Sequence, residues 1–164
     1  MKTSSLMIIL ILTPGFIFAQ EGDQNQENIS VQRKSAIHLA QDFLFTFSIN
    51  YERLFPLNEK NNLGLRVGLG RDGGNKDNTA IIGAFYLYGK SRHFLEAAVA
   101  YQQPNLFEKG GDDNPRLAIM AGYRYQAYSG FMLKVYPEFL PDLWPEEDSW
   151  GSLPFLGFAL GYAF

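Results

Sequence analysis

The sequence contains no cysteine among its 164 residues. It therefore cannot form a disulfide, cannot carry a lipid on an N-terminal cysteine and offers no thiol nucleophile. Only two histidines are present, so the residues needed for most zinc sites are also missing. We expect no metal and no cofactor.

Long apolar runs are absent as well. No stretch reaches the roughly 18 uncharged apolar residues that a transmembrane helix requires. Aromatic residues make up 15% of the chain and charged residues only 19%. If such a chain enters a membrane, it has to do so with β-strands, which hide half of their residues from lipid.

The N-terminus has the pattern of a secretory signal. Lys2 supplies the positive charge, residues 6–12 form a short apolar run, and cleavage is expected after Ala19. A helical anchor is disfavoured because the run is too short and is followed by Pro14 and a glycine. Residues 20–34 are polar and predict a flexible leader. Removal of the signal leaves 13 basic and 17 acidic residues, which gives no support to nucleic-acid binding.

From residue 35 to residue 164 the apolar residues recur with period two, which predicts β-strands. We expect one domain over 35–164, an all-β fold with eight strands. The expected strands are 35–41, 43–55, 62–71, 79–88, 94–103, 116–126, 131–139 and 154–164.

The faces of most of these strands can be assigned from the alternation. The last expected strand sets Leu156 and Phe158 against glycine and alanine, and the second places five apolar residues on one face. Those five are Phe43, Phe45, Phe47, Ile49 and Tyr51. The expected strand 79–88 is apolar on both faces and leaves its register open, and Pro137 predicts a strand end or a bulge in 131–139.

The connections alternate in length. Short turns are expected at 56–61, 89–92 and 127–130, and longer polar loops at 71–78, 104–115 and 140–153. The connection near residues 41–42 is an exception because it would be very tight. Short turns at one end and long loops at the other are typical of an antiparallel up-and-down transmembrane β-barrel.

The strand faces opposite the apolar ones decide which side points inward. They carry small residues and a balanced set of charges, which suit a crowded lumen, whereas a charge in lipid would cost roughly 2–4 kcal/mol near the midplane. We therefore expect the apolar faces outward, unlike those of a soluble lipocalin-like barrel or lipid carrier. The expected lumen charge network comprises Glu52, Arg66, Glu96, Arg124, Lys134 and Glu138.

Several segments resemble those of a known family, the small eight-stranded outer-membrane β-barrels of the OmpA/OmpX type found in Gram-negative envelopes. They are residues 48–53 (SINYER), 63–70 (LGLRVGLG), 93–96 (HFLE), 122–125 (GYRY) and 160–164 (LGYAF). The resemblance covers residues 35–164 and implies a location in the cell outer membrane, but this family is defined by architecture more than by an activity. Because the sequence carries no catalytic motif, we expect a structural or surface-interaction role and no enzymatic activity.

The same resemblance implies partners: outer-membrane lipid and lipopolysaccharide, and the barrel-assembly machinery during biogenesis, with the barrel itself a monomer. The closing segment resembles the signal that this machinery reads, with Leu160, Tyr162 and Phe164 as its apolar positions. Ala159 stands where that signal usually has glycine.

Two further hypotheses concern chemistry and ligands. In one, the chain is a lipid A-modifying enzyme (an acyltransferase or deacylase) with His38 as base, because Ser35 lies nearby in sequence. In the other, the loop 141–151 contacts a ligand or cations; the alternative is that its tryptophans are interfacial anchors and its acids are solvated. The loop residues concerned are Trp144, Glu146, Glu147, Asp148 and Trp150.

Overall fold

The computed structural model describes residues 33–43, 46–73, 78–104, 115–141 and 154–164. The expected signal segment 1–19, and the leader up to residue 32, lie outside these ranges. All strands belong to the unit formed by residues 32–164. They are β1 (Ser35–Asp42), β2 (Thr46–Pro56), β3 (Asn61–Asp72), β4 (Asn78–Lys90), β5 (His93–Gln103), β6 (Arg116–Gln126), β7 (Phe131–Phe139) and β8 (Phe155–Ala163).

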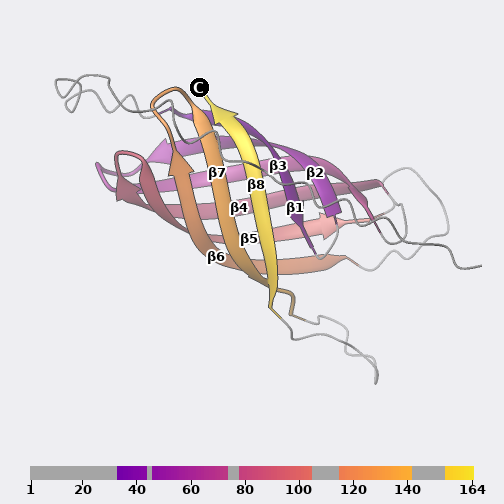
Figure 1. The fold of residues 1–164 in the computed structure, drawn as a ribbon. Helices are drawn as coiled ribbons and strands as arrows, with labels where there is room; N and C mark the ends of the chain where they lie inside the picture. The colour runs from indigo at the N-terminus through magenta and orange to yellow at the C-terminus, as the bar shows by residue number, and fades with distance from the viewer. Residues whose placement is uncertain (1–32, 44–45, 74–77, 105–114, 142–153) are drawn as a thin grey trace, which may run out of the picture. The chain divides into compact units, whose positions relative to one another are not determined.

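The strands form a closed antiparallel barrel in which each pairs with its neighbours in sequence (Figure 1). β8 returns to β1 and closes the sheet, with Leu160 opposite Leu39 and Ala163 opposite Ala36. Closure leaves no free edge strand among the eight strands that the structure describes. The predicted all-β, eight-stranded antiparallel barrel is confirmed.

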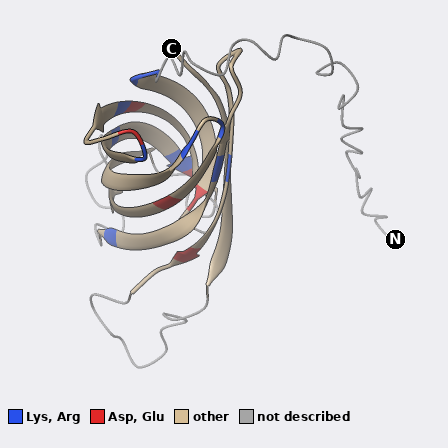
Figure 2. Ribbon diagram, turned by 90° about the vertical axis from the view of Figure 1, so that its left-hand side faces the viewer, with Lys and Arg blue, Asp and Glu red and all other residues tan. Residues whose placement is uncertain are grey.

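The two faces of the sheet are inverted relative to those of a soluble protein. Leu39 and Leu156 are 65% and 68% exposed on the outside, whereas Glu52 and Arg124 are fully buried in the lumen. In Figure 2 most of the barrel ribbon is uncharged, with short charged segments interspersed. The predicted orientation, apolar faces outward and charged faces inward, is confirmed.

The ends of the barrel differ in the length of their connections. At one end β2–β3, β4–β5 and β6–β7 are joined by residues 57–60, 91–92 and 127–130. Ser91 (φ 65°) and Gly130 (φ 105°) have the left-handed backbone that such tight turns demand. At the other end the connections span 43–45, 73–77, 104–115 and 140–154. We call these the turn end and the loop end; the predicted alternation, with its tight first connection, is confirmed.

The start of the second strand was predicted wrongly. β2 begins at Thr46, and Phe43 lies in the turn after β1 with a φ of 47° and no exposed surface. Its ring therefore does not continue the outward row formed by Phe47 and Ile49. Phe45 lies outside the described residues. Alternation alone cannot reveal a residue whose backbone leaves the strand conformation.

The register of β4, which the sequence left open, is fixed by its partners. Ile81, Phe85 and Leu87 point into the lumen, and Ile82 and Tyr86 point outward. The lumen thus contains apolar side chains at both ends. One cluster includes Phe43 and Ile81 near the loop end, and another includes Leu54 and Phe85 nearer the turn end.

Pro137 neither ends β7 nor marks a bulge, contrary to the prediction. The pairs Met120–Glu138 and Tyr123–Val135 have the same register on either side of it, and the pairing with β8 continues through it. Only the ladder with β6 is interrupted. Proline lacks the N–H that a ladder bond needs, so the strand tolerates it at the cost of local pairing.

Glycines in the lumen make room for large side chains on the neighbouring strand. Gly64 pairs with Phe85 and Gly161 with His38. A methyl group at Gly64 would overlap the Phe85 ring, and one at Gly161 would overlap the backbone and Cβ of His38. The small residues of one strand are therefore the space into which the large residues of the next are packed.

Candidate functional site: the charged lumen

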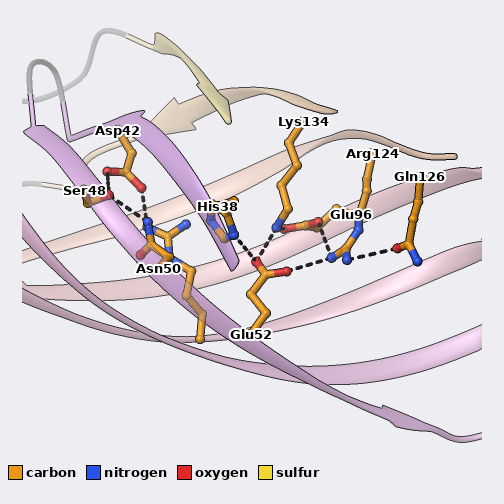
Figure 3. Close-up of polar contacts among 10 residues, drawn as sticks. His38, Asp42, Ser48, Asn50, Glu52, Glu96, Arg124, Gln126 and Lys134 are labelled. Carbon is orange, nitrogen blue, oxygen red and sulfur yellow. Dashed lines mark hydrogen bonds and ion pairs between the residues drawn. The ribbon is translucent and has the colours of Figure 1, made fainter. Parts of the chain in front are cut away.

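Glu52 is the centre of a buried ion cluster. Arg124 Nη1 donates to Glu52 Oε2 at 2.8 Å, and Lys134 Nζ donates to Glu52 Oε1 (Figure 3). Lys134 also donates to Glu96 Oε1 at 3.0 Å, and Arg124 Nη2 donates to Gln126 Oε1 at 3.1 Å. Two acids and two bases from β2, β5, β6 and β7 thus neutralise one another across the lumen.

An aromatic ring lies against the two cations of this cluster. The Phe85 ring centroid is 5.0 Å from Lys134 Nζ and 5.9 Å from Arg124 Cζ. The quadrupole of an aromatic ring attracts a cation over its face. Phe85 occupies this position because Gly64, opposite it on β3, has no side chain.

A second polar group lies nearer the loop end. Arg66 on β3 forms an ion pair with Asp42, the last residue of β1, and both side chains are buried. Asp42 also accepts from Ser48 Oγ at 3.4 Å, and Ser48 in turn accepts from Asn50 Nδ2 at 2.8 Å. This group belongs to β1, β2 and β3, so it ties the tight first hairpin to the next strand.

Glu138 has a different role from the other acids. Its Oε2 accepts the backbone N–H of Phe43 at 2.7 Å, across the lumen from β7 to the turn after β1. The Phe43 ring packs in the cluster formed by Ile81, Ala100, Ala118, Met120 and Tyr136. Phe43 is therefore turned inward, and its ring fills the lumen near the loop end.

The six residues predicted as one lumen network all lie in the lumen, but they do not form one network. Glu52, Glu96, Arg124 and Lys134 come together. Arg66 pairs instead with Asp42, and Glu138 bonds to a backbone N–H. Asp42 was not among the predicted lumen residues, because it was expected to lie in the first connection. The alternation from His38 through Ala40 would have placed it inside.

His38 lacks the surroundings of a catalytic base. It is buried in the lumen with Nδ1 3.8 Å from Glu52 Oε1, and neither ring nitrogen makes a hydrogen bond within the described residues. Ser35 lies on the other face of β1, where its Oγ contacts Tyr51 Oη at 3.1 Å and accepts from Arg53 Nη1 at 2.8 Å. The two side chains suggested as a pair by sequence proximity are therefore separated by the sheet.

Other predicted positions can be placed briefly. Leu160, Tyr162 and Phe164 are exposed along the outer face of β8 and its end. The five loop residues suggested as a contact surface lie outside the described residues: Trp144, Glu146, Glu147, Asp148 and Trp150. In the part of the chain that the structure describes, no group of three or more acidic or histidine side chains could hold a metal ion. Within those same ranges, no helix has the length and apolar character needed to cross a membrane.

The arrangement is suited to holding the barrel together. Buried charges are costly unless they are paired, and in the Glu52 cluster each is matched by an opposite charge. Together with the inward-turned Phe43, the paired side chains occupy the lumen from strand to strand.

Comparisons with known proteins bear on the fold. No protein-family model matches the chain, and no curated protein matches it. A de novo designed transmembrane β-barrel is similar, with a TM-score of 0.50 and 17% identity over 80% of this chain and 96% of that one. The N-terminal β-barrel domain of Pseudomonas aeruginosa OprF has a TM-score of 0.51 and 17% identity, covering 80% of this chain and 96% of the domain.

A third structure, the Yersinia pestis outer membrane protein Ail in a phospholipid bilayer nanodisc, is 12% identical with a TM-score of 0.48 and covers 81% of this chain and all of that one. At the identities of the first two structures, similarity concerns the architecture of the backbone. The predicted resemblance to small outer-membrane barrels is thus confirmed at the level of the fold.

Proposed function

We propose that this chain is an integral outer-membrane β-barrel protein that contributes to the envelope structurally or through surface contacts, with a closed lumen and no catalytic activity. The observation that carries the proposal is the inversion of the barrel's faces. Leu, Ile, Phe and Val side chains cover the outside of every strand, while Glu52, Arg124 and Lys134 are buried within.

The inversion has a direct energetic meaning. An apolar surface that surrounds a barrel is far larger than the few hundred Å² that a monomeric soluble protein usually exposes in one patch. In a bilayer the same surface is in contact with hydrocarbon, and the strands satisfy their backbone groups through closure. The charged side chains of the lumen then remain shielded from lipid by the sheet.

A closed lumen follows from its side chains. An eight-stranded barrel has an interior only wide enough for side chains to fill. Here the Glu52 cluster spans four strands near the turn end, and Phe43 packs against Ile81 and Met120 nearer the loop end. A wide aqueous pore is therefore not part of the proposal.

The location is tested by fractionating cells that express the full chain with its native N-terminus. Under the proposal, the protein sediments with outer-membrane markers and stays there after washing with urea or alkaline carbonate. Recovery in the soluble periplasmic fraction without detergent would contradict the proposal and favour the lipid-carrier alternative. A known outer-membrane barrel and a soluble periplasmic protein serve as the two controls.

The absence of catalysis is tested separately from the location. Purified barrel in detergent is incubated with lipopolysaccharide carrying labelled acyl chains, alongside His38→Ala and, as a control for a lumen substitution, Asn50→Ala. We expect no acyl release or transfer by any of the three proteins. Turnover by the unmodified chain that His38→Ala alone abolishes would overturn the non-enzymatic part and restore the lipid A-modifying alternative.

A further inference from the structure

Charge is distributed unevenly between the two ends of the barrel. The turn end carries a set of basic residues that we call the basic rim: Arg33, Lys34, Arg53, Lys60, Lys90 and Arg92. Among the described residues of that end, Glu59 is the one exposed acidic side chain, because Glu52 and Glu96 point into the lumen. In contrast, the described strand ends at the loop end carry both signs of charge. Arg116 forms an ion pair with Asp72 there, and Arg71 is a further cation. Figure 2, in which the short turns on the left of Figure 1 face the viewer, shows blue segments in turns and at strand ends.

Tyrosines surround the barrel just inside this rim. They are exposed on the outer face near the turn ends of β4, β6 and β8, in the β6–β7 turn, and at the middle of β2. These tyrosines are Tyr51, Tyr86, Tyr88, Tyr123, Tyr128 and Tyr162. Tyrosine rings favour the boundary between hydrocarbon and headgroups, because one end is apolar and the other forms hydrogen bonds. They therefore place the basic rim at headgroup depth.

The arginines of the rim are held in position by contacts with these tyrosines and their neighbours. The guanidinium of Arg92 lies 4.8 Å from the Tyr128 ring centroid, and that of Arg33 lies 5.7 Å from the Tyr162 centroid. Arg33 also donates to the backbone oxygens of Tyr128 and Ala163, at 2.6 and 2.8 Å. An arginine already held in place loses less conformational freedom when it binds an anion.

We propose that the basic rim binds the headgroups of anionic phospholipids of the phosphatidylglycerol type in the adjoining leaflet. The inference rests on the proposed function, because it requires the barrel to span a bilayer. The chemistry fits in two respects. The rim presents six cations against one exposed acidic side chain, and the phosphodiester of such a lipid carries one negative charge at the headgroup depth set by the tyrosines. A soluble acidic polymer would match the charge of the rim. It would have no reason to bind beside the belt of exposed tyrosines, which favours a membrane interface, so lipid is favoured.

The absence of cysteine makes a local test simple. A single fluorophore is attached at Ser129→Cys in the β6–β7 turn, or at Gly73→Cys at the loop end, in barrels folded into phosphatidylcholine vesicles. The vesicles contain a small fraction of phosphatidylglycerol or phosphatidylcholine bearing a nitroxide quencher near the headgroup. We expect the phosphatidylglycerol quencher to act about threefold more strongly at Ser129→Cys, and about equally at Gly73→Cys.

Charge-removal variants assign the effect to the rim. Lys90→Gln with Arg92→Gln should at least halve the preference at Ser129→Cys, whereas Arg71→Gln with Arg116→Gln, which removes two charges from the loop end, should leave it unchanged. Salt at 1 M, where the Debye length is about 3 Å, should abolish the preference. Equal quenching by both lipids in correctly folded barrels would overturn the proposal.

Failure of the inference is distinguishable from failure of the proposed function. Each sample is first checked for vesicle insertion by flotation and by heat-modifiable migration on a gel. A chain that does not insert contradicts the proposed function itself. A chain that inserts but shows no lipid preference, or that binds a soluble anionic glycan in place of lipid, contradicts only the assignment of the rim to phospholipid.

Discussion

At the scale of single residues, Glu52 balances two buried cations. It accepts from both Arg124 and Lys134 and is fully buried. Glu52→Gln would leave these cations with Glu96 as the remaining carboxylate of the cluster. Because breaking a buried ion pair leaves an uncompensated charge, we expect a loss of about 3–5 kcal/mol in the free energy of unfolding.

Urea unfolding in phospholipid vesicles, followed by tryptophan fluorescence, measures this loss. Glu59→Gln is the matched control because Glu59 is exposed in the β2–β3 turn, where the same change should cost less than about 0.5 kcal/mol. Removing a cation together with the acid, as in Glu52→Gln with Lys134→Met, should recover part of the loss. Equal stability of Glu52→Gln and Glu59→Gln would show that the cluster does not stabilise the barrel.

Phe43 combines a buried ring with an unfavourable backbone. Phe43→Ala should lower the free energy of unfolding by about 3 kcal/mol, because the ring leaves a cavity among Ile81, Met120 and Tyr136. Phe43→Gly should be more stable than Phe43→Ala by about 1 kcal/mol, because glycine tolerates the φ of 47°. The same unfolding experiment measures both.

Phe47→Ala provides the comparison for the ring, since Phe47 is exposed on the outer face of β2. Lipid can fill the space left by Phe47, so its loss should be smaller than that of Phe43. The inward position of Phe43 is contradicted if Phe47→Ala costs more than Phe43→Ala, or if Phe43→Gly is less stable than Phe43→Ala.

At the scale of strands, alternation in the sequence was enough to predict number, order and facing. It failed at Phe43, where the backbone leaves the strand conformation and the ring has turned inward. The prediction of a strand end or bulge at Pro137 rested on the proline and was wrong, because the register on either side of it is the same. Alternation also could not orient β4, because Ile81 and Ile82 are both apolar and only the partner strands distinguish them. The sequence could not show which charged side chains form ion pairs. Their pairing depends on the register between strands, and this register is set when the barrel closes and not by any one segment.

Pairs of glycine and a large residue on adjacent strands are the packing unit of the lumen. Gly64→Ala should cost about 1–3 kcal/mol, because its methyl group would overlap the Phe85 ring. Phe85→Leu removes the planar ring at the point of overlap, so Gly64→Ala should cost clearly less in that background. A double-mutant cycle of unfolding free energies gives the coupling directly. Additive effects of the two substitutions would contradict direct packing between them.

At the scale of the whole barrel, three charge environments are separated along and across the sheet. The lumen holds paired charges, the outer face is apolar, and the turn end bears the basic rim. The first two were predictable from the sequence, because alternation separates polar from apolar residues within each strand. The rim was not, because its members come from four separate connections or strand ends that meet only when the barrel closes.

The central claim is that this chain folds as a closed barrel with its apolar face in lipid, and heat-modifiable migration tests it most directly. Protein refolded in phospholipid vesicles is run on a denaturing gel with and without boiling. The account predicts a compact, faster-migrating band without boiling that shifts to the position of the unfolded chain after boiling, and that appears only when lipid or detergent is present. Identical migration before and after boiling, in a protein that remains soluble without lipid, would contradict it.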